Sequence, residues 1–184
     1  MQSLGRRDPD DHGPRYATVV LGERRVDDDW EPLDEQPVVG IIFDETDAAT
    51  GHGIEVGLTY AEDDDSAIDP VFGLGPADVE VETMEFYVGW RRTFRQAEQG
   101  LHPYVSAGAT GVRTSVDVSA GGLHEQESDM EPGVYVRAGL LWDLGPTLRC
   151  GLDYRYVLVD EHTLGGMEID SSFDQVLLTF GWAF

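Results

Sequence analysis

Residues 175–184 read QVLLTFGWAF, and this segment decides the fold class. Its even positions carry large apolar or aromatic side chains up to Phe184, whereas its odd positions are small or polar apart from Leu177. A period of two predicts a β-strand with two different faces. A strand of a soluble β-sandwich and a strand of a membrane barrel would show the same alternation. The composition of the second face has to discriminate between these two classes.

The preceding segments show what the second face contains. In residues 148–158 the even positions are bulky apart from Cys150, while the odd positions include Arg149, Asp153 and Arg155. Residues 134–144, 84–91 and 54–60 repeat the pattern, again with charges and glycines opposite the bulky residues. In a barrel inserted in lipid the bulky face points outward to hydrocarbon, and small or paired charged residues fill the inside. The sequence therefore favours a membrane barrel.

Three further segments alternate less clearly but complete the set. Residues 103–118 lose phase near positions 110–112, which suggests a bulge, residues 37–45 are nearly all apolar, and residues 16–26 alternate poorly. Together these segments predict about eight strands separated by turns rich in Gly, Pro, Asp and Ser, and no segment shows a convincing helical period. The predicted class is all-β.

The connections between these segments alternate in length. Long connections are expected at residues 27–36, 62–79, 119–132 and 161–172, and short ones at 46–51, 95–100 and the Gly145-Pro146 corner. Outer-membrane barrels have long loops outside and short turns on the periplasmic side. We therefore predict a closed eight-stranded antiparallel up-and-down transmembrane β-barrel over residues 16–184, preceded by an N-terminal extension over residues 1–15.

Composition excludes several classes of protein. The 184 residues contain 12 basic and 36 acidic side chains, and a net charge of -24 argues against binding to nucleic acid. No stretch approaches the roughly 18 apolar residues of a transmembrane helix. The lone Cys150 permits no internal disulfide. Residues 1–13 contain no apolar run, so no secretory signal is visible there.

The inward positions of the predicted strands carry charges of both signs. In a barrel this narrow, side chains from opposite walls meet, and an unpaired charge would cost several kcal/mol. We expect Arg137, Arg149 and Arg155 to face Glu55, Glu85 and Asp153 across the lumen. The expected lumen ion-pair network consists of Glu55, Glu85, Arg91, Arg137, Arg149, Asp153 and Arg155.

Four segments resemble the small eight-stranded outer-membrane barrels, the outer-membrane protein A-like or porin-family β-barrel domains: HPYVSAGATG (102–111), GVYVRAGLLW (133–142), LRCGLDYRY (148–156) and the terminal GWAF (181–184). The resemblance implies a place in the outer membrane of a Gram-negative bacterium, in contact with its lipid. It also implies that Phe184 is recognised by the barrel-assembly machinery. Aromatic girdles at the membrane interfaces are expected from Trp90, Trp142, Tyr154, Trp182 and Phe184.

Catalytic and metal sites find little support. The acidic runs at residues 27–31 and 62–65 offer oxygen ligands, but neither fits an EF-hand loop, so solvated loops that attract divalent cations are favoured over a specific site. Some eight-stranded barrels are lipid A deacylases with a His-x-Ser pair, which this sequence lacks. His124, Glu125 and Ser128 lie in a predicted loop that could not hold a triad rigidly. We expect no enzyme activity and no cofactor.

The size of the barrel excludes an open pore, because side chains fill the interior of eight strands. The favoured function is a structural or surface-interaction role exerted through long acidic extracellular loops. A lipid-modifying barrel enzyme and a soluble lipocalin-like carrier remain as alternatives, although a carrier would need an apolar lumen.

Overall fold

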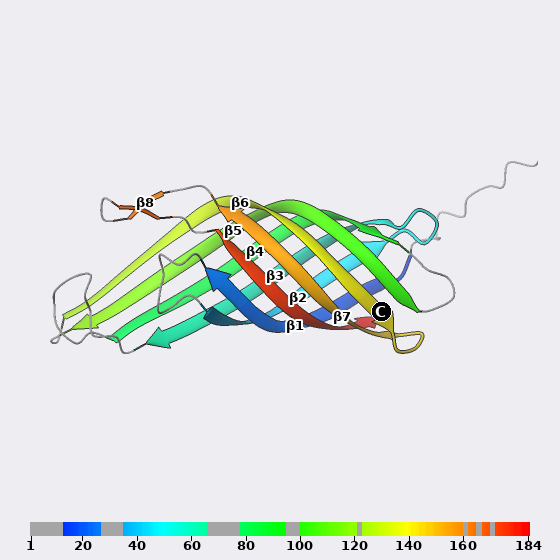
Figure 1. The fold of residues 1–184 in the computed structure, drawn as a ribbon, viewed down its shortest axis with the longest axis horizontal. Helices are drawn as coiled ribbons and strands as arrows, with labels where there is room; N and C mark the ends of the chain where they lie inside the picture. Colours follow the sequence, from blue (N-terminus) through cyan, green and yellow to red (C-terminus); the bar gives the residue numbers. More distant parts are fainter. Residues whose placement is uncertain are drawn as a thin grey trace, which may run out of the picture.

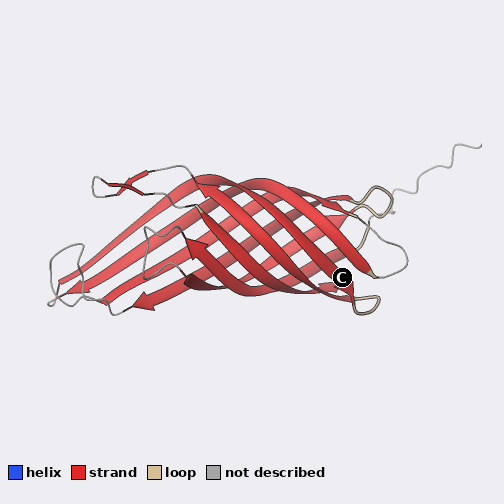
Figure 2. Ribbon diagram, in the orientation of Figure 1, coloured by secondary structure: helices blue, strands red, loops and turns tan. Residues whose placement is uncertain are grey.

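The computed structural model describes residues 13–26, 35–65, 78–94, 100–120, 123–159, 162–164, 167–169 and 172–184. Figure 2 shows these residues as strands and short loops, without helices. The strands are β1 (Arg15–Val26), β2 (Glu35–Thr46), β3 (His52–Asp65), β4 (Asp78–Thr93), β5 (Leu101–Ala120), β6 (Leu123–Asp143), β7 (Leu148–Val159), β8 (His162–Leu164), β9 (Met167–Ile169) and β10 (Phe173–Ala183).

Eight of these strands form a closed barrel in the order β1-β10-β7-β6-β5-β4-β3-β2 (Figure 1). Each strand pairs antiparallel with its neighbours, and β1 closes the sheet by pairing with both β10 and β2. The predicted eight-stranded antiparallel fold is confirmed. The short strands β8 and β9 form a separate hairpin within the connection expected at residues 161–172.

The alternation of burial along the strands gives the barrel its two faces. In β10, Val176, Leu178 and Phe180 are each about half exposed, whereas Leu177 between them is completely buried. The same parity holds in β3, β4, β6 and β7, so the bulky face points outward as predicted. Such a continuous apolar surface is rare on a soluble monomer and is the normal outer surface of a membrane barrel.

The bulge expected in β5 is not present. The register runs without a break through Thr110↔Gly133 and Val112↔Glu131, and the side chains of Thr110 and Val112 are both buried in the lumen. The apparent loss of phase has a simple cause, because the outward residue between them, Gly111, has no side chain to mark the lipid face.

The connection expected at residues 119–132 is also wrong, since most of it is strand. β5 and β6 stay paired up to Ala120↔Leu123, although the last pair of β6 with β7 is Gly133↔Val159. Residues 123–132 of β6 therefore extend beyond β7, and in Figure 1 this hairpin reaches past the barrel on the left. A strand outside the membrane has no apolar face, which is why its sequence reads as a loop.

The opposite end of the barrel carries the short turns and the last residue of the chain (Figure 1). In the first turn, Asp47 Oδ1 accepts hydrogen bonds from the backbone N–H groups of Ala49 and Thr50. Gly51 follows with φ of 72°, a conformation that favours glycine. Of the N-terminal extension expected over residues 1–15, residues 1–12 lie outside the described residues, and Arg15 already belongs to β1.

Candidate functional site: the charged lumen

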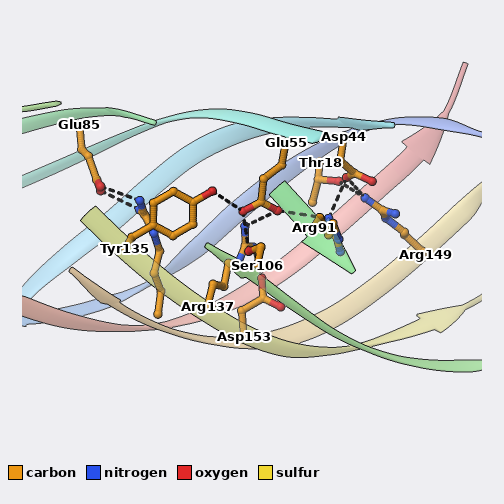
Figure 3. Close-up of polar contacts among 11 residues, drawn as sticks. Thr18, Asp44, Glu55, Glu85, Arg91, Ser106, Tyr135, Arg137, Arg149 and Asp153 are labelled. Carbon is orange, nitrogen blue, oxygen red and sulfur yellow. Dashed lines mark hydrogen bonds and ion pairs between the residues drawn. The ribbon is translucent and has the colours of Figure 1, made fainter. Parts of the chain in front are cut away.

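The charged residues expected in the lumen come from four strands and converge inside the barrel. Glu55 lies on β3, Glu85 and Arg91 on β4, Arg137 on β6, and Arg149, Asp153 and Arg155 on β7. All seven side chains are buried. Figure 3, which labels all of them except Arg155, shows them distributed along the barrel and joined by dashed polar contacts, and they fall into three groups.

The first group surrounds the carboxylate of Glu85. Arg155 binds it with two parallel hydrogen bonds, from Nη1 to Oε2 at 2.8 Å and from Nη2 to Oε1 at 2.7 Å. The hydroxyls of Thr59 and Thr110 also donate to it, at 3.0 and 2.7 Å. Arg24 Nη2 lies 3.7 Å from Oε2. This buried carboxylate is therefore fully coordinated by donors, which offsets much of its desolvation cost.

Aromatic rings hold the arginines of this group in place. The guanidinium carbon of Arg155 lies 3.9 Å from the ring centre of Tyr87 and 4.3 Å from that of Tyr135. Arg24 lies 4.0 Å over the ring of Phe173, and Gln175, with its amide oriented to accept, bonds to Arg24 at 3.1 Å. Cation–π contacts away from water are worth about 2 kcal/mol.

The second group is centred on Glu55. Its Oε1 accepts hydrogen bonds from Ser106 at 2.7 Å and Tyr135 at 2.9 Å. Its Oε2 lies 3.6 Å from Arg91 Nη1 and 3.8 Å from Arg137 Nη1. The other Nη of Arg137 donates to Asp153, so one arginine joins carboxylates from two strands.

The third group lies closest to the end with the short turns, and it differs from the prediction. Arg149 does not face Glu55, Glu85 or Asp153; it donates to Asp44, and to Thr18 at 3.1 Å. Arg91 Nη1 lies 3.2 Å from the same oxygen of Asp44. The partner expected for Arg149 was therefore wrong, and Asp44 on β2 is a further member of the lumen network.

Arg24 and Asp44 were missed because of the strands that carry them. Arg24 lies on β1, where the alternation is poor, and Asp44 lies on β2, which is nearly all apolar. The tyrosines Tyr87, Tyr104 and Tyr135 were missed as well, although each lies at an inward position of its strand, Tyr87 and Tyr135 at odd positions and Tyr104 at an even one. Extending the inward parity through every strand would have found all five.

The lumen is electrically balanced. Among the described residues the buried arginines are Arg24, Arg91, Arg137, Arg149 and Arg155, and the buried carboxylates are Asp44, Glu55, Glu85, Glu131 and Asp153. Removing these five pairs from the 12 basic and 36 acidic residues of the chain leaves seven basic and 31 acidic ones. The net charge of -24 therefore lies outside this set of lumen residues.

The lumen is also closely packed around its third group. A void between Asp44, Arg91, Tyr104, Arg149 and neighbouring side chains leaves no space for a water-sized molecule. Glycines make room for the tyrosines, since a Cβ on Gly57 would lie 2.3 Å from Tyr87 Cζ, and one on Gly89 would lie 2.1 Å from the Tyr135 hydroxyl. The inside is a packed core of ion pairs and rings.

The other candidate sites do not assemble in the described part of the chain. There, no group of three His, Cys, Asp or Glu residues could hold a metal ion. His124 and Ser128 lie on β6, paired with Ser119 and Ser115, and four residues of strand separate their backbones by about 13 Å. The acidic run at residues 27–31 lies outside the described residues.

Comparison with known proteins identifies the family to which this barrel belongs. No described helix is both long and apolar enough to cross a membrane. The profile of the outer membrane protein beta-barrel domain family matches residues 9–184. The chain belongs to this family. Members of the family reside in the bacterial outer membrane, so the exposed apolar face of this barrel is its lipid-facing surface, and outer-membrane lipid surrounds it.

Solved structures share the fold at low sequence identity. Ail, the attachment invasion locus protein of Yersinia pestis, has 17% identity and a TM-score of 0.63, with 94% of this chain and 99% of that chain covered. Neisserial surface protein A has 13% identity and a TM-score of 0.57, with 93% and 96% covered. OprG from Pseudomonas aeruginosa has 11% identity and a TM-score of 0.63, with 94% and 97% covered. No curated protein sequence matches the chain closely enough to count as a relative.

The family and the lumen together reject one earlier alternative. A soluble lipocalin-like carrier needs a polar outer surface and an apolar cavity. This barrel has the reverse arrangement, with tryptophans such as Trp90, Trp142 and Trp182 on its outer surface and ion pairs inside. The tryptophans lie close to the strand ends with the short turns, as expected of a girdle, whereas Tyr154 lies at mid-strand.

Proposed function

We propose that this outer-membrane barrel is a non-catalytic structural and surface-interaction protein whose acidic outer end binds cations. One observation carries the proposal: the buried charges of the described lumen compensate one another, so the net charge of -24 is carried by the other residues of the chain. A surface of one sign raises the local concentration of ions of the other sign. The partners expected from this chemistry are divalent cations and cationic ligands.

Carboxylates of the described outer strand ends support this proposal. Glu62 on β3 and Glu82 on β4 lie directly opposite each other in the register, and both are exposed. The Tyr60 hydroxyl lies 2.7 Å from Glu62 and 3.1 Å from Glu82. Opposed like charges destabilise a pair of strands, and a hard cation such as Ca²⁺ or Mg²⁺ would relieve that repulsion.

Arginine neutralises part of the neighbouring surface. Arg25 donates to Glu23 at 3.1 Å and lies 3.7 Å from Glu35. The hydrogen bond to Glu23 and the charges of both carboxylates raise the pKa of Arg25. Glu62 and Glu82 have no such cation among the described residues, so they are the better test of cation binding.

The experiment compares calcium binding with ion conduction in the same purified protein. Isothermal titration of the detergent-solubilised barrel with CaCl₂ should show binding that weakens in Glu62→Gln/Glu82→Gln. It should be unchanged in Glu45→Gln, where the carboxylate pairs with Arg15. Planar bilayers containing the protein should show no steady conductance. Absence of calcium binding, or an open-channel current, would reject the proposal.

We also propose that Phe184, the last residue of this sequence, is read by the barrel-assembly machinery. Its side chain is well exposed on the outer surface, and its backbone N–H donates to Arg15 O at 3.1 Å. Phe184→Ser should reduce the amount assembled in the outer membrane of cells while leaving refolding of purified chain in detergent intact. Equal loss in both assays would mean that Phe184 acts on stability and not on recognition.

A further inference from the structure

The lipid-facing surface along β5 is shallower than the surface along its neighbours. Three successive outward positions of β5 carry the small residues Ala107, Ala109 and Gly111, and the next outward position is Arg113. The neighbouring strands carry larger residues at the positions that border them. In the register the bordering residues are Trp90, Val88 and Phe86 on β4 and Val136, Val134 and Pro132 on β6.

These residues form an apolar furrow with definite dimensions. From Ala107 to Gly111 the floor is about 13 Å long, at 3.3 Å per residue, and its walls on β4 and β6 are about 10 Å apart, twice the spacing of neighbouring strands. Met130 covers the outer end, since its methyl group lies 3.2 Å from the position of a Cβ on Gly111. A single hydrocarbon chain fits between these walls, and a methionine can adapt to it.

Arg113 at the outer end of the furrow is exposed and lies between Met84 and Met130 in the register. It makes no hydrogen bond or ion pair with any described residue. Glu82, two positions along β4 from Met84, is engaged by the Tyr60 hydroxyl instead. This differs from the other outward arginines near carboxylates, since Arg15 pairs with Glu45 and Arg25 with Glu23.

We propose that the furrow binds one acyl chain of a phosphorylated glycolipid of the lipid A class, with a phosphate of that lipid on Arg113. The long connections place Arg113 toward the outer leaflet, where this lipid resides in an outer membrane. The guanidinium group matches a phosphate in charge and geometry. The exposed carboxylates on the neighbouring strand ends repel phosphates, so they direct the lipid to this furrow.

Charge also decides against a second copy of the chain as the occupant. Two barrels in one membrane share the same orientation, so a symmetric contact along β5 would bring the two Arg113 side chains toward each other. The described furrow contains no carboxylate that could separate them. An anionic lipid removes this conflict and fills the furrow.

The test measures lipid that remains on the purified protein. The barrel is extracted from outer membranes in mild detergent with EDTA present, and bound lipid A is counted by native mass spectrometry. EDTA removes lipid held through divalent cations at the acidic strand ends, so failure of this proposal is distinguishable from failure of the proposed function. The wild-type protein should retain one lipid A per barrel.

Four variants locate the site. Arg113→Gln should reduce retention about five-fold, the effect of one arginine near a charged membrane surface, and Arg113→Lys should keep most of it. Ala109→Phe should reduce retention by filling the furrow. Arg25→Gln, a change of an arginine on β1, should have no effect. Unheated gel mobility identifies any variant that fails to form the barrel.

Three results would overturn the proposal. The first is unchanged retention in a folded Arg113→Gln protein. The second is equal retention of phosphatidylglycerol and lipid A when both are supplied in mixed micelles. The third is a cross-linked dimer through cysteines placed at position 109 in the Cys150→Ser background, which would show that a second barrel occupies the furrow.

Discussion

Replacing Arg155 by alanine would leave the buried carboxylate of Glu85 without its main partner. Both side chains are completely buried and are joined by two hydrogen bonds. Breaking a buried ion pair on one side costs about 3–5 kcal/mol, because the remaining charge stays in a medium that solvates it poorly. Thr59, Thr110 and Arg24 still face Glu85, so we expect the low end, about 3 kcal/mol of unfolding free energy.

The assay is urea unfolding of the protein in lipid vesicles, followed by the fluorescence of its four tryptophans. Arg15→Ala is the matched control, because Arg15 pairs with Glu45 at 3.0 Å on the exposed surface and should contribute about 0–1 kcal/mol. Adding Glu85→Gln to Arg155→Ala should recover part of the loss, since it removes the unpaired charge. The reasoning is refuted if Arg155→Ala costs no more than Arg15→Ala, or if Glu85→Gln in that background recovers nothing.

Further predictions concern the two faces of the wall. Leu152→Arg, at an outward position in the middle of β7, should lower the free energy of unfolding in the same vesicles by about 2–4 kcal/mol. Leu144→Arg, beyond the end of β6, should lower it by about 0–1 kcal/mol. Equal costs would contradict the assigned membrane position. Gly57→Ala should lower the free energy of unfolding by about 1–3 kcal/mol, because the added Cβ collides with Tyr87. Gly145→Ala is the control and should be neutral, since its added Cβ meets no atom within 4 Å. A Gly57→Ala protein of unchanged stability would show that the lumen is loosely packed. The purified protein should require detergent and migrate faster on a gel unheated than boiled, and a monodisperse sample in plain buffer would contradict the membrane assignment.

The sequence predicted the fold well because most strands of this membrane barrel alternate between lipid-facing apolar residues and small or polar lumen residues. The alternation at residues 148–158 and 175–184 is confirmed in β7 and β10, down to which side chains are buried. The prediction from alternation failed where a strand does not face lipid. Above the membrane, β6 has water on its outer face, so residues 123–132 carry no apolar stripe and read as a loop.

The sequence predicted which charged side chains point into the lumen, but not which residues pair with each other there. The seven expected lumen residues lie inside the barrel, because strand parity determines which way a side chain points. Which carboxylate meets Arg149 depends on the stagger between distant strands, and Asp44 lies 105 residues away from it in the sequence. No local pattern encodes that stagger, so the pairing needed the three-dimensional register.

The seam between β1 and β10 governs when this protein can fold. Tyr16 pairs with Ala183, so the strands that close the barrel come from opposite ends of the chain. Until β10 has been delivered, β1 and β7 each present a row of unsatisfied backbone groups, which are templates for aggregation. The barrel therefore cannot close before β10 has been delivered, and a ribosome that stops shortly before β10 releases a product that cannot close.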